Sequence, residues 1–86
     1  MIIMIKTATE TPLMVRYVAA ANMTGSPVIL LEDGVYQAHK LVGLCDSLKI
    51  RQSDAEHRGV NADGAELISD SDIVALIEQH GKQVVL

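Results

Sequence analysis

The segment Pro27-Val28-Ile29-Leu30-Leu31-Glu32-Asp33-Gly34-Val35-Tyr36 places four aliphatic residues in a row before an acidic pair and a glycine. A short unbroken apolar run bounded by turn residues is typical of a strand buried on both faces, as in a parallel sheet covered by helices. Asp33 can accept from the free N–H groups that open a helix, and Gly34 tolerates the positive φ of a tight turn. The segment therefore predicts a strand, a turn and a helix, with Asp33 and Gly34 as a structural corner.

Four further segments rich in aliphatic residues are expected to be strands. They are residues 1–5, 48–51, 65–68 and 83–86. Residues 1–5 form an unbroken apolar run, which again predicts a strand buried on both faces. Residues 48–51 alternate between apolar and charged side chains, which predicts a strand exposed on one side or near a sheet edge.

Apolar residues at helical spacing and capping residues predict four helices between these strands. The first is expected to begin near Pro12 after a cap at Thr9 or Thr11 and to bury one stripe of residues, Leu13, Met14, Tyr17, Val18 and Ala21. The others are expected at residues 35–44, in a single turn ending at Gly59, and between a cap at Ser69 or Ser71 and a stop at Gly81. Residues 61–64 are expected to form a loop. The order βαβαβαβαβ predicts an α/β fold, a three-layer α/β/α sandwich with a mostly parallel five-stranded sheet.

Length and composition limit the classes of protein to which the chain can belong. The chain has 86 residues, enough for one domain over residues 1–86, and 49% of them are hydrophobic, with two Tyr and neither Phe nor Trp. So much aliphatic content in so short a chain suggests that some apolar surface is buried against a partner. The net charge of −4 argues against direct nucleic-acid binding. A single cysteine and the lack of a long apolar run predict a soluble cytoplasmic protein with no membrane contact.

Few residues could carry chemistry. Cys45 is the only thiol, and its place at the end of a weak helix beside Asp46 favours a partly buried small hydrophobe over a reactive thiolate. Glu32 and Asp33 could bind a divalent cation, but adjacent side chains on a strand point to opposite sides, so capping by Asp33 is the favoured interpretation. The three histidines lack metal-ligand spacing, and no phosphate-binding or nucleophile motif is present. The sequence therefore predicts no catalytic residue, metal or cofactor.

Three segments together resemble a known family. Residues 28–35 are similar to an aliphatic strand ending in Gln-Asp-Gly-Val, and residues 49–60 are similar to a strand followed by a short acidic helix closed by Arg-Gly-Leu. In the third, Leu67-Ile68-Ser69-Asp70 leads into a helix with Ile73 and Val74. In this order and spacing, the segments resemble the DsrH/TusB family of sulfur-relay proteins within the DsrE/DsrF/DsrH superfamily. The resemblance covers nearly the whole chain.

The resemblance implies a DsrEFH-like fold and a subunit of a hetero-oligomer with DsrE/TusD-like and DsrF/TusC-like partners. Such complexes relay persulfide sulfur toward 2-thiolation of the wobble uridine of tRNA, or act in dissimilatory sulfur oxidation. In the DsrE/TusD branch the carrier cysteine lies just after a strand, at the start of the helix that ends Arg-Gly. The matching residues here, 51–54, contain no thiol. The resemblance therefore implies a non-catalytic subunit rather than an enzyme.

The segment that matches the carrier position is polar and charged. Its residues Ser53, Asp54, Glu56 and Arg58 make a poor ligand pocket, and we expect them to lie at the rim of a subunit interface. A homo-oligomer remains an expectation for the chain when it is alone. The alternative is a free-standing α/β ligand-binding module or small enzyme that uses the Glu32-Asp33-Gly34 corner.

Overall fold

A five-stranded, all-parallel sheet forms the centre of the molecule in a computed structural model that describes residues 1–61 and 63–86. The strands stand in the order β4-β3-β2-β1-β5. Their bounds are Ile2–Ile5 (β1), Val28–Leu30 (β2), Leu48–Arg51 (β3), Glu66–Ile68 (β4) and Gln83–Val85 (β5). The α/β prediction is confirmed, and the sheet is wholly rather than mostly parallel. Ala62, within the expected loop 61–64, lies outside the described residues.

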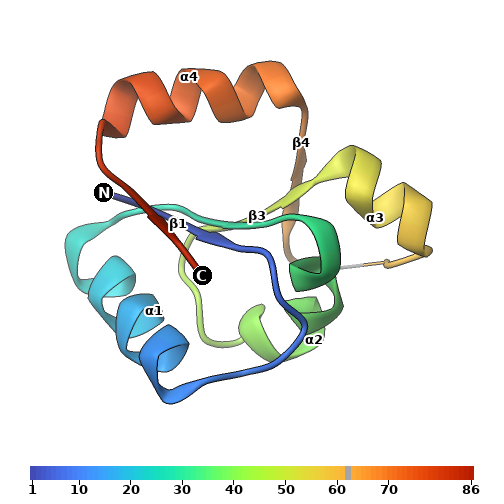
Figure 1. Ribbon diagram of the computed structural model, residues 1–86, viewed down its shortest axis with the longest axis horizontal. Helices are drawn as coiled ribbons and strands as arrows, with labels where there is room; N and C mark the ends of the chain where they lie inside the picture. Colours follow the sequence, from blue (N-terminus) through green and yellow to red (C-terminus); the bar gives the residue numbers. More distant parts are fainter. Residues whose placement is uncertain (62) are drawn as a thin grey trace.

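The helices cover both faces of the sheet (Figure 1). They are α1 (Pro12–Thr24), the 3-10 helix η1 (Glu32–Gln37), α2 (Ala38–Leu41), α3 (Gln52–Arg58) and α4 (Asp70–His80). Strands β1 to β4 step across the sheet in one direction, whereas α4 leads back past them to β5 on the far side of β1. Since crossovers between parallel strands are right-handed, this reversal puts α4 on the face opposite α1 and α2.

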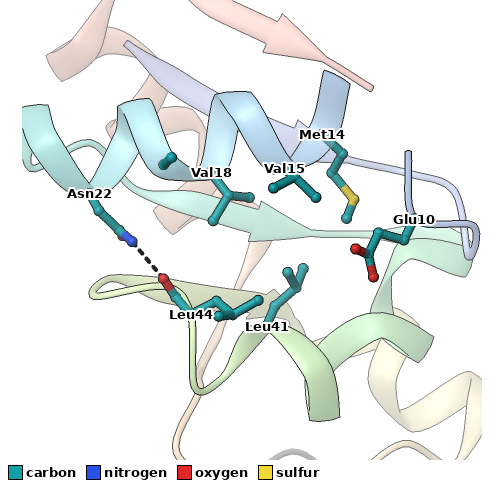
Figure 2. A pocket seen from close by; sticks show the side chains of 8 residues that line it. Glu10, Met14, Val15, Val18, Asn22, Leu41 and Leu44 are labelled. Carbon is teal, nitrogen blue, oxygen red and sulfur yellow. Dashed lines mark hydrogen bonds between the residues drawn. The ribbon is translucent and has the colours of Figure 1, made fainter. Parts of the chain in front are cut away.

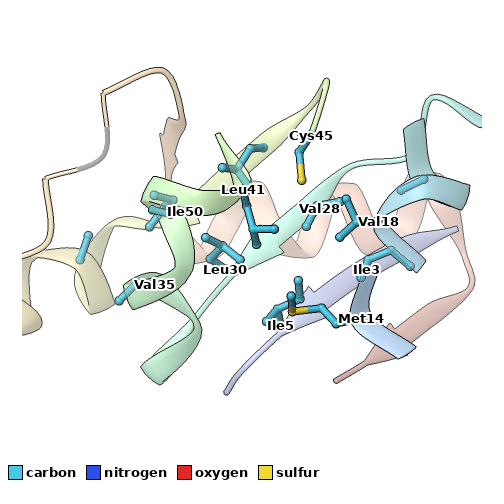
Figure 3. Close-up of a cluster of buried hydrophobic side chains, with 14 residues drawn as sticks. Ile3, Ile5, Met14, Val18, Val28, Leu30, Val35, Leu41, Cys45 and Ile50 are labelled. Atoms are coloured by element: carbon cyan, nitrogen blue, oxygen red, sulfur yellow. The ribbon is translucent and has the colours of Figure 1, made fainter. Parts of the chain in front are cut away.

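The core consists of two aliphatic clusters separated by the sheet. The larger one lies beneath α1 and α2 (Figure 3) and includes Ile3, Ile5, Val28 and Leu30. The smaller one lies beneath α4 and comprises Ile2, Ile29, Ile68 and Ile73. Consecutive residues of β1 and β2 thus enter opposite clusters, which confirms that these strands are buried on both faces. Each such aliphatic side chain stabilises the fold by roughly 1.5–3 kcal/mol.

Side-chain caps set the start of the two longest helices. Thr11 Oγ1 accepts a hydrogen bond from the Met14 N–H at 3.1 Å, so Thr11 rather than Thr9 caps α1. Ser69 caps α4 in a reciprocal capping box with Asp72. The expected buried stripe of α1 was partly wrong, because Leu13 is 52% exposed. Only Met14, Val18 and Ala21 of that stripe are buried.

The second helix differs most from its prediction. One helix was expected over residues 35–44, interrupted by Gly43 near its end. The chain instead forms η1 followed by a single turn of α2, and Gly43 lies in the turn beyond. The third helix was also underestimated, since α3 spans seven residues rather than one turn. Strand β3 alternates in burial as expected and lies between β2 and β4, one strand in from the edge.

The corner at Asp33 and Gly34 exists for reasons other than those predicted. Leu31 is the N-cap residue of η1, and Asp33 does not cap this helix. Gly34 does not adopt a positive φ; the residue that does is Glu32, at 52°. Glycine is required at Gly34 because a Cβ there would overlap the backbone carbonyl group of Ile5. The prediction was right about the residue and wrong about its cause.

We expect Gly34→Ala to lower the free energy of unfolding by about 2–3 kcal/mol, because the added methyl group must displace backbone rather than a flexible side chain. Urea denaturation measures the change. Gly43→Ala is the matched control, because a Cβ at that position meets no atom within 4 Å. Equal stability of the two variants would contradict the close approach of η1 to β1.

Candidate functional site

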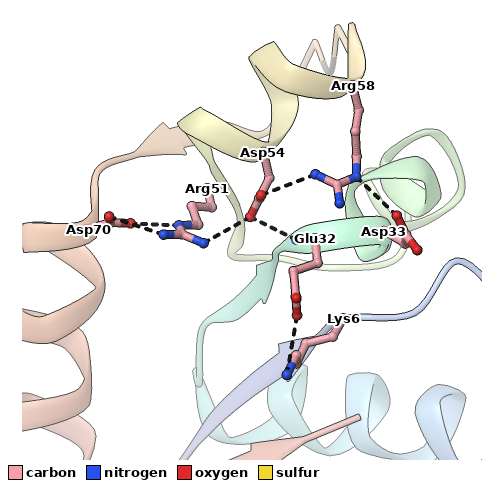
Figure 4. Close-up of polar contacts among 7 residues, drawn as sticks. All are labelled: Lys6, Glu32, Asp33, Arg51, Asp54, Arg58 and Asp70. Atoms are coloured by element: carbon pink, nitrogen blue, oxygen red, sulfur yellow. Dashed lines mark hydrogen bonds and ion pairs between the residues drawn. The ribbon is translucent and has the colours of Figure 1, made fainter.

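Five charged residues form a connected cluster where the parallel strands end (Figure 4). We call it the acid–base cluster; its members are Asp33, Arg51, Asp54, Arg58 and Asp70. Asp33 follows β2, Arg51 ends β3, and Asp70 opens α4 after β4, while Asp54 and Arg58 lie on α3. Parallel strands bring their carboxyl ends to one edge of the sheet, where sites of α/β proteins commonly lie.

Asp54 is the centre of the acid–base cluster, and its side chain is 13% exposed. Its Oδ2 accepts hydrogen bonds from the Glu32 backbone N–H at 2.8 Å and from Arg51 Nη1 at 3.4 Å. Its Oδ1 accepts from Arg58 Nη1 at 3.2 Å. Asp54 therefore satisfies the free N–H group at the start of η1, the role that the sequence analysis assigned to Asp33.

Glu32 is held in an unfavourable backbone conformation at this edge. Its φ of 52° lies in the left-handed region, which non-glycine residues rarely adopt. The hydrogen bond to Asp54 fixes its backbone, and Lys6 Nζ lies 3.3 Å from its Oε2. Such strain persists only where surrounding contacts determine the conformation, as these two do.

Each of the two arginines in the acid–base cluster is bound by carboxylates from different elements. Arg51 donates from Nε to Asp70 Oδ1 at 2.6 Å and from Nη2 to Asp70 Oδ2 at 3.2 Å, a bidentate pair. Arg58 donates from Nε to Asp33 Oδ1 at 3.1 Å. All five members are thus engaged with one another, so the acid–base cluster joins η1, β3, α3 and α4.

Two carboxyl groups at the start of α4 have lowered pKa values. The hydrogen bond from Arg51 lowers the pKa of Asp70, and the Ser69 backbone N–H lowers the pKa of Asp72. Both groups therefore stay ionised to lower pH in the folded chain than in the unfolded one. Their contribution to stability is present above the ordinary aspartate pKa and is lost as the pH falls below it. Solvent screening keeps this contribution small, because both side chains are exposed.

The residues predicted to form an interface rim separate into two groups. Ser53 and Glu56 are exposed, and Glu56 accepts a hydrogen bond from Gln52 within α3. Asp54 and Arg58 instead point into the acid–base cluster. Sequence reasoning missed Lys6, Arg51 and Asp70 as members of this edge, because no regular spacing connects them.

We expect Asp54→Ala to lower the free energy of unfolding by about 2–3 kcal/mol, since it leaves the Glu32 N–H without its acceptor and removes one of the two carboxylates that bind each of Arg51 and Arg58. Thermal and urea denaturation measure the loss. Asp46→Ala is the control, because the Asp46 carboxylate forms no ion pair among the described residues. An Asp54→Ala protein as stable as this control would show that the carboxylate does not anchor η1.

Cys45 lies in the larger core cluster at the turn after α2 (Figure 3). It is 9% exposed, and its N–H donates to the Leu41 carbonyl at 2.8 Å. Burial, together with the neighbouring Asp46 carboxylate, raises the pKa of the thiol to about 11. Because the thiolate is the nucleophilic form of cysteine, this environment disfavours nucleophilic attack by Cys45.

We expect Cys45 in the folded protein to react with iodoacetamide at pH 8 at least roughly 100-fold more slowly than in the urea-unfolded protein, since two pKa units remove that fraction of thiolate. The rate should rise about tenfold per pH unit up to about pH 11, provided the protein stays folded. Mass spectrometry of timed samples gives the rates. A plateau below pH 9 would contradict the raised pKa.

An apolar groove runs between α1 and the segment that follows α2 (Figure 2). Its cavity volume is about 220 Å³, and its lining residues are Glu10, Met14, Val15, Val18, Ala19, Asn22, Leu41 and Leu44. Val15 and Leu44 are 46% and 58% exposed. Asn22 closes one end, where its Nδ2 donates to the Leu44 carbonyl and its Oδ1 accepts from the Asp46 N–H. The groove offers apolar contact area and little chemistry.

A larger hollow lies between η1, α2 and the end of α3. Its volume is about 530 Å³, and its lining residues are Tyr36, His39, Arg58, Gly59, Val60, Asn61 and Asp63. We call it the Tyr36 hollow. At the Glu32-Asp33-Gly34 corner, the Ile5 backbone lies against Gly34, and Asp33 forms an ion pair with Arg58.

Two further properties concern metals and membranes. Within residues 1–61 and 63–86, no three or more His, Cys, Asp or Glu side chains are arranged to hold a metal ion. None of the described helices combines the length and apolar character needed to cross a membrane.

No protein-family model matches the chain, and no curated protein or solved structure matches it significantly.

Proposed function

We propose that this chain is a non-catalytic subunit of a cytoplasmic sulfur-relay complex, of the kind formed by DsrH/TusB-like proteins with DsrE/TusD-like and DsrF/TusC-like partners. The observation that carries the proposal is the acid–base cluster. Its ion pairs connect the three segments on which the resemblance rests: Asp33 lies in the first, Arg58 in the second and Asp70 in the third. The three segments therefore form one structural unit.

The environment of the single thiol supports a role without sulfur transfer. In the DsrE/TusD branch the carrier cysteine lies just after a strand, at the start of the helix that ends Arg-Gly, and the matching residues here, 51–54 at the start of α3, contain no thiol. Cys45 belongs to a different part of the fold, where burial disfavours its thiolate. A partner subunit would therefore supply the sulfur carrier.

Exposed apolar surface supports assembly with partner subunits. The helix α1 has one charged residue, Arg16, among its 13 residues. Its side chains Leu13, Val15 and Met23 are 52%, 46% and 88% exposed. With the apolar groove beside them, they form the kind of surface that other subunits cover. The net charge of −4 favours protein partners over direct contact with tRNA.

The experiment that tests this proposal is co-expression of the tagged chain with the DsrE/TusD-like and DsrF/TusC-like proteins of the same organism. We expect a stoichiometric complex by size-exclusion chromatography with light scattering. The relay activity of the complex, measured as persulfide transfer or as 2-thiolation of tRNA in a reconstituted assay, should fall when this chain is omitted. It should be unchanged in Cys45→Ser.

Two results would contradict the proposal. One is a chain that stays monomeric in the presence of both partners. The other is near-stoichiometric persulfide on Cys45, detected by intact mass after incubation with a cysteine desulfurase and cysteine, and absent in Cys45→Ser. That result would make this chain a sulfur carrier.

A further inference from the structure

The strand β5 forms an uncharged edge of the sheet. It lies beside β1 at the end of the strand order, and its residues are Gln83, Val84 and Val85 (Figure 1). Edge strands of natural proteins usually carry charges, prolines or bulges that prevent pairing with another chain. The opposite edge, β4, carries Glu66, whose Oε2 lies 2.7 Å from Lys49 Nζ. The sheet therefore has one edge protected by charge and one edge, β5, that is suited to a further strand.

The hydrogen bonds to β1 determine which main-chain groups of β5 face outward. The Lys82 carbonyl and the Leu86 N–H both bond to β1, each at 2.8 Å. The main-chain groups of successive residues point to opposite sides of a strand, so Val84 also faces β1. The N–H and C=O groups of Gln83 and Val85 therefore point away from β1. The outer edge presents two donors and two acceptors.

The side chains of β5 leave apolar surface at the same edge. Val84 and Leu86 pack against the larger core cluster but are only half-buried. Val85, on the other face of the sheet, is 55% exposed. A strand beside β5 would cover part of all three side chains, because directly opposed residues lie roughly 4.5–5.5 Å apart. The edge thus combines outward main-chain groups with apolar side chains on both faces of the sheet.

The pattern of this edge matches a second copy of itself. Main-chain donors and acceptors at strand spacing are matched by another extended chain rather than by a small molecule. Any other protein must bring an uncharged edge strand of its own, which a second copy has by necessity. In an antiparallel pair centred on Val84, the outward groups of Gln83 meet those of Val85 in the second copy, and the reverse contact is identical. This register forms four hydrogen bonds and uses every outward group of β5.

Charge favours the same register. Lys82 is the only charged residue between positions 81 and 86, and it lies opposite Leu86 of the second copy rather than opposite the other Lys82. The two lysines are then about 13 Å apart along the strands, farther than the screening length of about 8 Å at physiological ionic strength. The two β5 strands therefore approach each other with little charge repulsion.

We propose that the chain forms a two-fold dimer in which the β5 strands of two copies pair antiparallel about Val84, so that two five-stranded sheets become one continuous sheet. This inference goes beyond the proposed function, because the contact involves neither the acid–base cluster nor the apolar groove. Both of these surfaces stay accessible to other subunits in the dimer. Strands of three residues give a small interface, so the dimer is weak.

Sedimentation equilibrium of the purified chain alone tests the dimer. We expect the mean mass to rise from 9.3 kDa toward twice that value between about 1 μM and about 1 mM. Val85→Pro removes an outward N–H but no bond to β1, so it should raise the dissociation constant at least about 10-fold. Val85→Thr is the matched control, because it keeps the N–H and the β-branched shape, and it should dimerise within about 3-fold of the wild type. Denaturant melts show whether both variants keep the fold.

Cross-linking tests the register independently of the proline variant. In a Cys45→Ser background, Val84→Cys and Val85→Cys each introduce the only thiol. In the proposed dimer the Cα atoms of the two copies are roughly 4.5 Å apart at position 84 and roughly 7–8 Å apart at position 85. Only the first separation suits a disulfide, so we expect Val84→Cys to cross-link at least about 10-fold faster under mild oxidation. Exposure alone would predict the opposite order, because Val84 is half-buried and Val85 is exposed.

Three outcomes would overturn the inference. The first is a wild-type chain that stays monomeric up to about 1 mM. The second is a dimer that Val85→Pro forms as tightly as Val85→Thr and in which Val85→Cys cross-links at least as fast as Val84→Cys, since that dimer uses another surface. The third is a mass that grows beyond the dimer, since pairing of β5 with β4 of the next copy does not close and extends into a filament. These measurements contain no partner subunit, so the proposed function is tested separately.

Discussion

The carbonyl group of Ile5 at the end of β1 is the constraint on which this edge of the fold depends. Its oxygen accepts a hydrogen bond from the Leu31 N–H at 3.0 Å, and Gly34 lies against the same group. This contact makes the chain turn into η1 immediately after β2. Glu32 and Asp33 are thereby brought to α3, where Asp54 and Arg58 bind them. If Gly34 carried a side chain, η1 could not pack so closely on β1, and the acid–base cluster would lose one of the four elements that contribute to it.

Much of the architecture could be predicted because it follows from local patterns. The apolar runs in β1 and β2 indicate burial on both faces, and Ser69 and Gly81 set the bounds of α4. The second helix was mispredicted because apolar spacing alone does not separate a 3-10 helix from an α-helix. The 3-10 helix depends on a tertiary contact between Gly34 and the Ile5 carbonyl group. Leu13 was mispredicted because the spacing of apolar residues does not reveal how wide the buried face of α1 is.

The candidate site was predictable only in part, since its contacts join residues far apart in the sequence. Asp33 and Asp54 are equally able to cap a helix, and only the tertiary fold determines that Asp54 reaches the Glu32 N–H. The polar segment 53–58 was recognised, but nothing in its sequence shows that Asp54 and Arg58 point inward while Ser53 and Glu56 face solvent. The exposure of Tyr36 likewise depends on the geometry of η1, which no local sequence pattern indicates.

The place of β5 in the sheet has a consequence for the order of folding. Ile2 is aligned with Gln83 and Ile3 with Val84, so β1 pairs with the strand most distant from it in sequence. Closing so long a loop costs entropy before any contact offsets it, and pairings of this kind form slowly. The segments from β1 to β3 need only short crossovers and can assemble earlier. The β1–β5 register is therefore expected to form late, leaving the outer side of β1 unpaired in the partly folded chain.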